Sequence, residues 1–151
     1  MFHIVLLEPE IPPNTGNIAR TCMVTGSRMH LIRPLGFDVD DKTLKRAGLD
    51  YWHELDWTVH DSYEAYARQP ARRWFLSTRG GRCYTDADFA DGDHLVFGRE
   101  TAGLPQSLLD ANPGAVLRTP MRNAARSMNL SNAAAVVLYE ALRQLEFASL
   151  L

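Results

Sequence analysis

The sequence predicts an α/β domain, in which a mainly parallel sheet carries helices on both faces. Two observations support this fold class. Short apolar runs of strand length alternate with segments of helical period along the 151 residues, an order typical of βαβ units. Hydrophobic residues make up 46% of the chain, enough for a full core. Because no repeat, low-complexity stretch or linker divides it, residues 1–151 are expected to form a single domain.

The first half of the chain opens with the apolar run His3–Leu7, which predicts the first strand. A helix is expected over Asn14–Thr25, with two prolines before it and Gly26 as its stop. Met29–Ile32 predicts the second strand. Asp41–Gly48 predicts a short charged helix, because its acidic residues come early and its basic residues late, as the helix dipole favours.

In the second half, Asp61–Arg68 predicts a helix, and three short apolar runs predict buried strands: Trp74–Ser77, His94–Phe97 and Ala115–Leu117. Leu130–Leu145 has the clearest helical pattern of the chain. Its apolar positions recur at spacings of three and four, at Leu130, Ala133, Ala134, Val137, Leu138, Ala141, Leu142 and Leu145.

The bulk composition excludes several classes of protein. The net charge of −2 predicts no broad basic surface, yet only two of the sixteen basic residues are lysine. The planar guanidinium of arginine presents its donors in a rigid arrangement that suits phosphate. The alternative is that the excess of arginine over lysine reflects a GC-rich genome. Cys22, Cys83 and the five histidines lack metal-binding spacing, so no metal site is expected and the histidines are interpreted as structural or surface residues.

The chain has no apolar run near the ~20 residues of a membrane span. Its first residues predict a strand rather than a signal peptide, so a cytoplasmic location without a membrane partner is expected.

The first polar motif, residues 8–20, runs from the first strand through a proline-rich loop into the first helix. Asn14 or Thr15 is expected to cap that helix. Asn17 and Arg20 are three residues apart and share a helix face, where an amide beside a guanidinium suits a phosphate or a hydroxyl. The plainer alternative is a cap and a surface arginine.

The second motif, Gly98–Pro105, contains Glu100 as its only acidic residue. Its glycines allow the backbone to pass close to a ligand. Glu100 is expected either to accept hydrogen bonds from that ligand or to hold Arg20. An exposed Glu–Arg pair in an ordinary turn is the alternative.

The third motif, Thr119–Asn132, concentrates four short polar side chains at the start of the last helix: Ser127, Asn129, Ser131 and Asn132. One of these must cap the helix, and a ligand edge would explain the others. Three arginines lie around the motif and are candidates to contact a phosphate-bearing partner: Arg118, Arg122 and Arg126. The carboxyl ends of parallel strands meet at one edge, so the motifs are expected to lie close together.

Nucleotide-binding fingerprints are absent from the chain. No GxGxxG follows the first strand and no GxxxxGK[ST] occurs, which argues against NAD, FAD and P-loop nucleotides.

All three motifs, in this order, resemble those of the SPOUT superfamily of S-adenosylmethionine-dependent RNA methyltransferases. Within it the chain is most similar to the short single-domain TrmL/YibK group of tRNA wobble 2′-O-methyltransferases. The specific stretches are residues 8–18 and 127–133, and residues 46–51 also look like this group. Arg99 is a departure, because the group often has proline there, and the loop at residues 122–125 is looser than usual.

The resemblance implies a deep trefoil knot near the C-terminus, which topology rules alone would reject. It implies that S-adenosylmethionine is held by Leu76, Gly98, Thr119, Met121, Ser127 and Leu130. It places Arg20, Asn14, Glu100 and Asn129 at the reaction. It also implies a homodimer whose active sites draw on both subunits, in line with Val136 and Tyr139 on the solvent side of the last predicted helix.

The activity implied is 2′-O-methylation of the ribose at the wobble nucleotide, position 34, with a tRNA anticodon stem-loop as partner. Arg20 is expected to polarise and position the hydroxyl, because a guanidinium is a poor base. Alternatives are another tRNA or rRNA position on the same fold, a non-catalytic RNA-binding or assembly factor that keeps the cofactor pocket, and a small-molecule-binding protein without an RNA partner.

Overall fold

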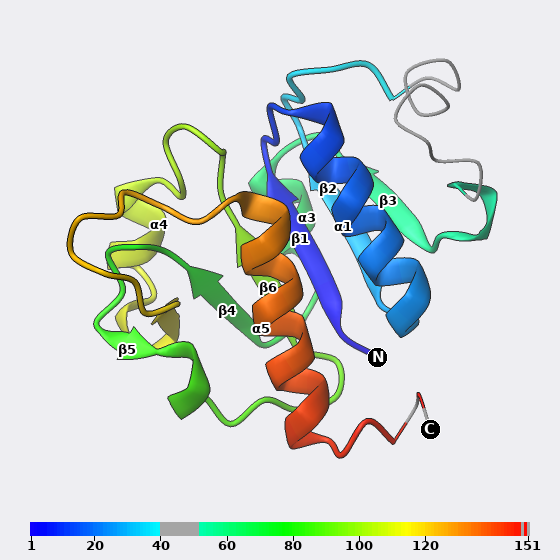
Figure 1. Ribbon diagram of the computed structural model, residues 1–151. Coiled ribbons are helices and arrows are strands. Elements are labelled where there is room, and N and C mark those ends of the chain that lie inside the picture. Colours follow the sequence, from blue (N-terminus) through cyan, green and yellow to red (C-terminus); the bar gives the residue numbers. More distant parts are fainter. Residues whose placement is uncertain (40–51, 149, 151) are drawn as a thin grey trace.

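The computed structural model describes residues 1–39, 52–148 and 150 as a twisted sheet with helices packed on it (Figure 1). The seven strands are β1 His3–Leu7, β2 Arg28–Ile32, β3 Trp57–His60, β4 Arg73–Leu76, β5 Arg82–Cys83, β6 His94–Phe97 and β7 Val116–Arg118. Their order in the sheet is β3-β2-β1-β6-β4-β7-β5, and the pairs are parallel. The predicted α/β class with a mainly parallel sheet is confirmed.

Helices cover both faces of the sheet, as predicted. α1 (Pro12–Thr25) and α5 (Leu130–Gln144) lie side by side on one face, while the shorter α3 (Tyr63–Ala67) and α4 (Gln106–Asp110) lie on the other. Alternate residues of β1 enter the two cores: Ile4 packs beneath α1 and α5, and Val5 packs with residues of α3 and α4. The predicted apolar stripe of the last helix is buried or partly buried in the first of these cores.

The start of α1 corrects one expectation. The helix begins at Pro12, because prolines at the first two positions need no N–H partner and fix the helical φ. Ile11 is therefore the N-cap and no side chain caps the helix, so the expected cap by Asn14 or Thr15 is wrong. Asn14 lies inside the first turn, where it is buried. Gly26 ends the helix in the left-handed region, as predicted.

Three elements were not predicted from the sequence. β3 lies at the edge of the sheet with every residue half-buried, and β5 is only two residues long. α4 occupies a stretch without helical periodicity. The 3₁₀ turns η1 Trp52–Glu54, η2 Tyr84–Asp86 and η3 Pro113–Ala115 complete the described elements. The charged helix expected at Asp41–Gly48 and the motif residues 46–51 lie outside the described residues.

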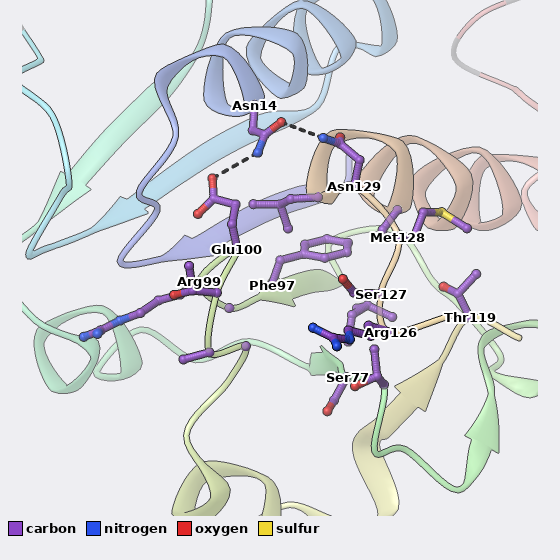
Figure 2. A pocket seen from close by; sticks show the side chains of 18 of the residues that line it. Asn14, Ser77, Phe97, Arg99, Glu100, Thr119, Arg126, Ser127, Met128 and Asn129 are labelled. Carbon is purple, nitrogen blue, oxygen red and sulfur yellow. Dashed lines mark hydrogen bonds between the residues drawn. The ribbon is translucent and has the colours of Figure 1, made fainter. Parts of the chain in front are cut away.

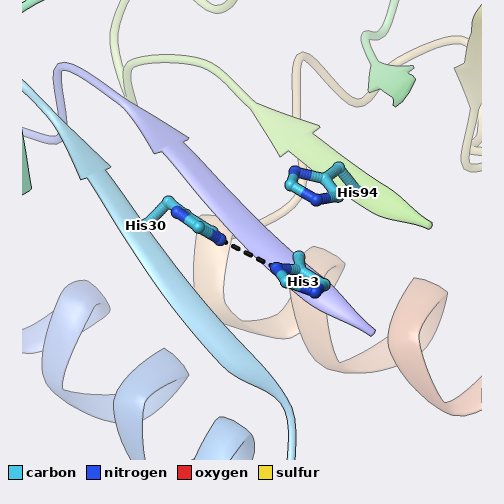
Figure 3. Close-up of side chains that lie close together, drawn as sticks. All are labelled: His3, His30 and His94. Carbon is cyan, nitrogen blue, oxygen red and sulfur yellow. Dashed lines mark hydrogen bonds between the residues drawn. The ribbon is translucent and has the colours of Figure 1, made fainter. Parts of the chain in front are cut away.

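Four histidines form a row across the sheet on the face that carries α3, and Figure 3 shows three of them. The rings of His3 and His94 stack 4.1 Å apart, and His3 Nδ1 lies 2.8 Å from His30 Nε2. His30 Nδ1 in turn lies 2.9 Å from His60 Nε2. At the end of the row, the hydroxyl of Tyr66 on α3 forms a 2.6 Å hydrogen bond with His94 Nδ1. We refer to His3, His30, His60 and His94 as the histidine row.

No helix among the described residues is long and apolar enough to cross a bilayer.

Candidate active site

The three polar motifs meet around one cavity of about 680 Å³, as expected from their positions at strand ends. It lies between the carboxyl ends of β4 and β6, the residues after β7, and the first turns of α1 and α5 (Figure 2). A volume of this size suits a ligand of nucleoside dimensions or somewhat larger. Leu76, Phe97 and Leu130 supply apolar surface, while hydroxyl and amide side chains supply polar edges.

Glu100 is the centre of a hydrogen-bond network on one side of the cavity. Its Oε2 accepts from the backbone N–H of Glu10 at 2.8 Å, and its Oε1 accepts from the N–H of Ile11 at 3.1 Å. The Asn14 side-chain amide donates to the same Oε1 at 3.3 Å. Glu100 therefore satisfies N–H groups before and at the start of α1, a contact that neither sequence hypothesis for this residue named. A carboxylate placed there also favours the positive end of the helix.

Asn14 and Asn129 join the two helix starts on one side of the cavity (Figure 2). Asn129 Nδ2 donates to Asn14 Oδ1 at 3.0 Å. The Oδ1 of Asn129 accepts from the N–H groups of Ser131 and Asn132, which makes it the N-cap of α5. One polar chain thus runs from Glu100 through Asn14 to the start of α5.

The loop of residues 98–103, which we call the glycine loop, folds back on itself beside this chain. A Cβ at Gly98 would lie 2.1 Å from the carbonyl carbon of Gly103, so no other residue fits there. Gly103 has φ +68°, in the left-handed region that favours glycine. Arg99 and Gly103 exchange backbone hydrogen bonds at 3.3 and 2.9 Å. The loop is therefore a tight turn whose residues line the cavity.

The cavity lining also contains Arg79, which was not predicted from the sequence. Arg79 follows β4 and donates to Leu104 O at 3.1 Å and to Gln106 Oε1 at 2.5 Å. These bonds tie the turn after β4 to the residues beyond the glycine loop. A single surface arginine carries no signal in the sequence, because its two partners lie 25 and 27 residues away.

All six residues expected to hold a cofactor line this one cavity: Leu76, Gly98, Thr119, Met121, Ser127 and Leu130. Of the four residues expected at the reaction, three line it as well: Asn14, Glu100 and Asn129.

Arg20 does not belong to the cavity lining described here. It lies nearly two turns beyond Asn14 on α1, and its side chain is exposed, as is that of Asn17. Among the candidate RNA contacts, Arg126 lines the cavity, whereas Arg118 and Arg122 are exposed outside it.

Arg99 pairs with Glu8 and extends away from the other labelled side chains of the cavity (Figure 2). The pair links the glycine loop to the residue that follows β1. Glu8 itself has φ 52°, an uncommon conformation for a non-glycine residue.

The histidine row also brings three possible metal ligands together, which the sequence spacing did not reveal. Ring nitrogens of His3, His30 and His94 lie within 4.8 Å of one another. A nitrogen lone pair lies in the plane of its ring, and the planes of His3 and His94 are 8° from parallel in a stack. As they stand, those two rings do not aim at a common point. The expectation that the histidines hold no metal stays a prediction.

Burial keeps the histidine row uncharged. It lowers the pKa of His30 to about 3 and that of His94 to about 4, and the neighbouring histidines add to the effect at His30. Burial and the Arg28 guanidinium lower the pKa of His3 and His60 as well. Neutral rings can alternate as donor and acceptor along the row, which the short N···N contacts require.

Comparison with known proteins connects the cavity to a family. The SpoU rRNA methylase family matches residues 1–139. The chain is 55% identical over 151 residues to the tRNA (cytidine(34)-2′-O)-methyltransferase of Saccharophagus degradans, covering 98% of each chain. It is 53% identical to the enzyme of the same name from Escherichia coli K12, covering 97% of this chain and 96% of that one.

A solved structure described as giving insights into the 2-OH methylation of C/U34 on tRNA superposes with a TM-score of 0.91 at 47% identity, covering 97% of both chains.

Proposed function

The chain belongs to the SpoU rRNA methylase family, and we propose that it methylates the ribose 2′-hydroxyl of the wobble nucleotide, position 34, of tRNA, with S-adenosylmethionine as methyl donor. The support is twofold. Relatives at 55% and 53% identity over nearly their full length carry that activity in their names, and the polar motifs meet at one cavity of suitable size.

The residues of the cavity fit this donor. Leu76, Phe97 and Leu130 offer apolar surface for an adenine ring. The glycine loop brings the main chain to the cavity wall, because position 98 leaves no room for a side chain. Main-chain groups and small hydroxyls can satisfy the polar edges of a nucleoside. When bound, S-adenosylmethionine supplies a methyl group on a positively charged sulfur.

The chain's own task is to orient the ribose and to assist loss of its proton. A C–O bond forms as the S–C bond breaks, the hydroxyl proton leaves, and S-adenosylhomocysteine is the other product. Arg20 polarises the hydroxyl and holds the neighbouring phosphate, while solvent or an RNA phosphate takes the proton. Correct orientation supplies most of the acceleration, up to roughly 7–11 kcal/mol.

A second copy of the chain brings Arg20 to the reaction, since Arg20 lies outside the cavity of its own chain. Exposed apolar side chains lie on the same two packed helices: Val24 on α1, and Val136 and Tyr139 on α5. A two-fold dimer through α1 and α5 would cover them and place an active site between subunits. The C-terminal trefoil knot and a cytoplasmic location beside tRNA belong to the same proposal.

The single observation that carries the proposal is the convergence of Asn14, Glu100 and Asn129 on a cavity lined by all six expected donor contacts. The test incubates the protein with methyl-labelled S-adenosylmethionine and total RNA from a strain lacking this enzyme, and then maps the labelled nucleotide. Label on the ribose at position 34 is expected. Label confined to rRNA or to another tRNA position would overturn the substrate, and no transfer to any RNA would overturn the reaction.

A further inference from the structure

A second acidic contact holds the tip of the glycine loop, and the functional assignment above does not use it. The hydroxyl of Thr101 donates to Glu10 Oε2 at 2.8 Å, with Oε1 at 3.0 Å. The backbone N–H of Thr101 also donates to Glu10 Oε2, at 3.1 Å. One carboxylate therefore binds both donors of the residue at the loop tip.

Glu10 is a fixed partner because its backbone is held on two sides. Its N–H donates to Glu100. On the other side, a Cβ at Gly36 would lie 2.8 Å from the Glu10 Cα, so the two backbones are in close contact. Gly36 N–H also donates to Pro9 O at 2.9 Å. The carboxylate of Glu10 thus projects from a rigid segment.

Glu10 is the partner that binds Thr101 itself, beside the contacts of Glu100 and Arg99 on the same loop. The turn is closed at its base by the Arg99–Gly103 bridge, and residues 101–103 are exposed. Thr101 nevertheless lines the cavity. Its position therefore sets one side of the space available to a ligand.

We propose that Glu10 and Thr101 are positioning residues, which keep the glycine loop in its cavity-lining shape before the methyl donor binds. Together with Glu100 they form two reciprocal contacts: Glu100 of the loop binds the main chain at residues 10 and 11, and Glu10 binds the loop tip. When the loop is already ordered, less conformational entropy is lost as the donor binds. The inference rests on the proposed function, because the ligand is taken to be S-adenosylmethionine.

The test compares Thr101→Val, which keeps the side-chain shape but loses the hydroxyl, with Thr101→Ser, which keeps the hydroxyl. Calorimetry measures the Kd of S-adenosylhomocysteine, and a transfer assay at saturating donor measures kcat. Thr101→Val is expected to raise the Kd about five- to tenfold, because Thr101 is exposed and its hydrogen bond then contributes no more than an ordinary one. Its kcat should stay within about twofold, and Thr101→Ser should restore the affinity.

Glu10→Gln provides the second variant, because an amide keeps the size of the carboxylate while removing its charge and one acceptor. It should raise the Kd by a similar factor, and the double variant with Thr101→Val should add little, as expected for one shared contact. Thr85→Val is the matched control: Thr85 is exposed, its hydroxyl contacts Cys83, and it lies outside the cavity lining described above.

Equal affinity of Thr101→Val and wild type would overturn the proposal, as would additive losses in the double variant. A fall in kcat with unchanged affinity would also overturn it, because it would place the pair at the reaction and not at the donor wall. Failure of the proposed function gives a different result: the wild type itself would then bind no S-adenosylhomocysteine.

Discussion

Two clusters of polar side chains, the network around Glu100 and the histidine row, each draw on neighbouring parallel strands, yet they differ in what those side chains leave open. At the carboxyl edge, Glu100, Asn14 and Asn129 bond to one another and still line a cavity of about 680 Å³. The histidine row, which runs across the sheet from the first residues of β1 and β6 to the last residue of β3, is packed ring against ring, and His30 and His94 are buried. Clustering of polar groups therefore does not itself identify a site; the accessible space beside them does.

The two clusters also differ in how they accommodate charge. The network around Glu100 satisfies main-chain groups of a helix start, so the charge of the carboxylate is compensated while the cavity stays open. The histidine row avoids charge altogether, because burial keeps its rings neutral. The carboxylate beside the cavity is thus held by hydrogen bonds, whereas the buried imidazoles of the histidine row stay neutral.

The largest expected effect is that of replacing Arg20, which lies outside the cavity lining. Arg20→Ala should lower the rate of methyl transfer at least about a hundredfold, because the proposed function assigns Arg20 to stabilising the reacting hydroxyl. The Kd of S-adenosylhomocysteine should stay within about twofold. Mixing Arg20→Ala with an inactive Asn129→Ala variant should restore part of the activity if sites form between two chains. Turnover close to that of the wild type would contradict the assignment.

Glu100→Ala tests the carboxyl edge next. Removing the carboxylate leaves the N–H groups of Glu10 and Ile11 and the Asn14 amide without their acceptor. Equilibrium urea unfolding should show a loss of about 2–3 kcal/mol in the free energy of unfolding, together with weaker donor binding. Glu64→Ala, at a fully exposed carboxyl on α3, is the comparison variant and should bind the donor normally. Unchanged stability and donor affinity in Glu100→Ala would show that neither the fold nor the cavity depends on the hydrogen bonds that Glu100 accepts.

Low pH should lower the stability of the folded chain through the histidine row. The pKa of His30 (about 3) and that of His94 (about 4) are depressed in the folded chain. The unfolded chain takes up protons below about pH 6.5 that the folded chain refuses, so stability is full above that pH and falls as the pH drops toward 4.

The free energy of unfolding should therefore fall by about 3 kcal/mol between pH 7.5 and 5.5, from about 1.4 kcal/mol for each of the two histidines. His94→Phe should flatten this dependence, and His53→Gln, which changes an exposed histidine outside the row, should not. Identical slopes for all three proteins would show that the row does not resist protonation.

The smallest effect is expected at Arg99. Its ion pair with Glu8 is partly exposed, with 44% and 23% of the two side chains accessible. Such pairs contribute about 0–1 kcal/mol. Arg99→Ala should lower the free energy of unfolding by less than about 1 kcal/mol, and the difference from wild type should shrink in 0.5 M salt as the charges are screened. A loss of several kcal/mol would show that the glycine loop depends on this pair.

The sequence located most of the cavity because its residues come in contiguous motifs at strand ends. Strand order brings Gly98 and Thr119 to one edge whatever the details of register. The position of Arg20 could not be obtained in the same way, because it depends on which helix face is buried. The histidine row was missed for a related reason: His3, His30 and His94 are 27 and 64 residues apart, and only strand register makes them neighbours.

The short contact between Asn14 and Asn129 spans 115 residues of sequence. During translation, this part of the cavity wall does not exist until the ribosome has passed residue 129. Nascent chains that end before Asn129 should therefore be unable to bind the methyl donor.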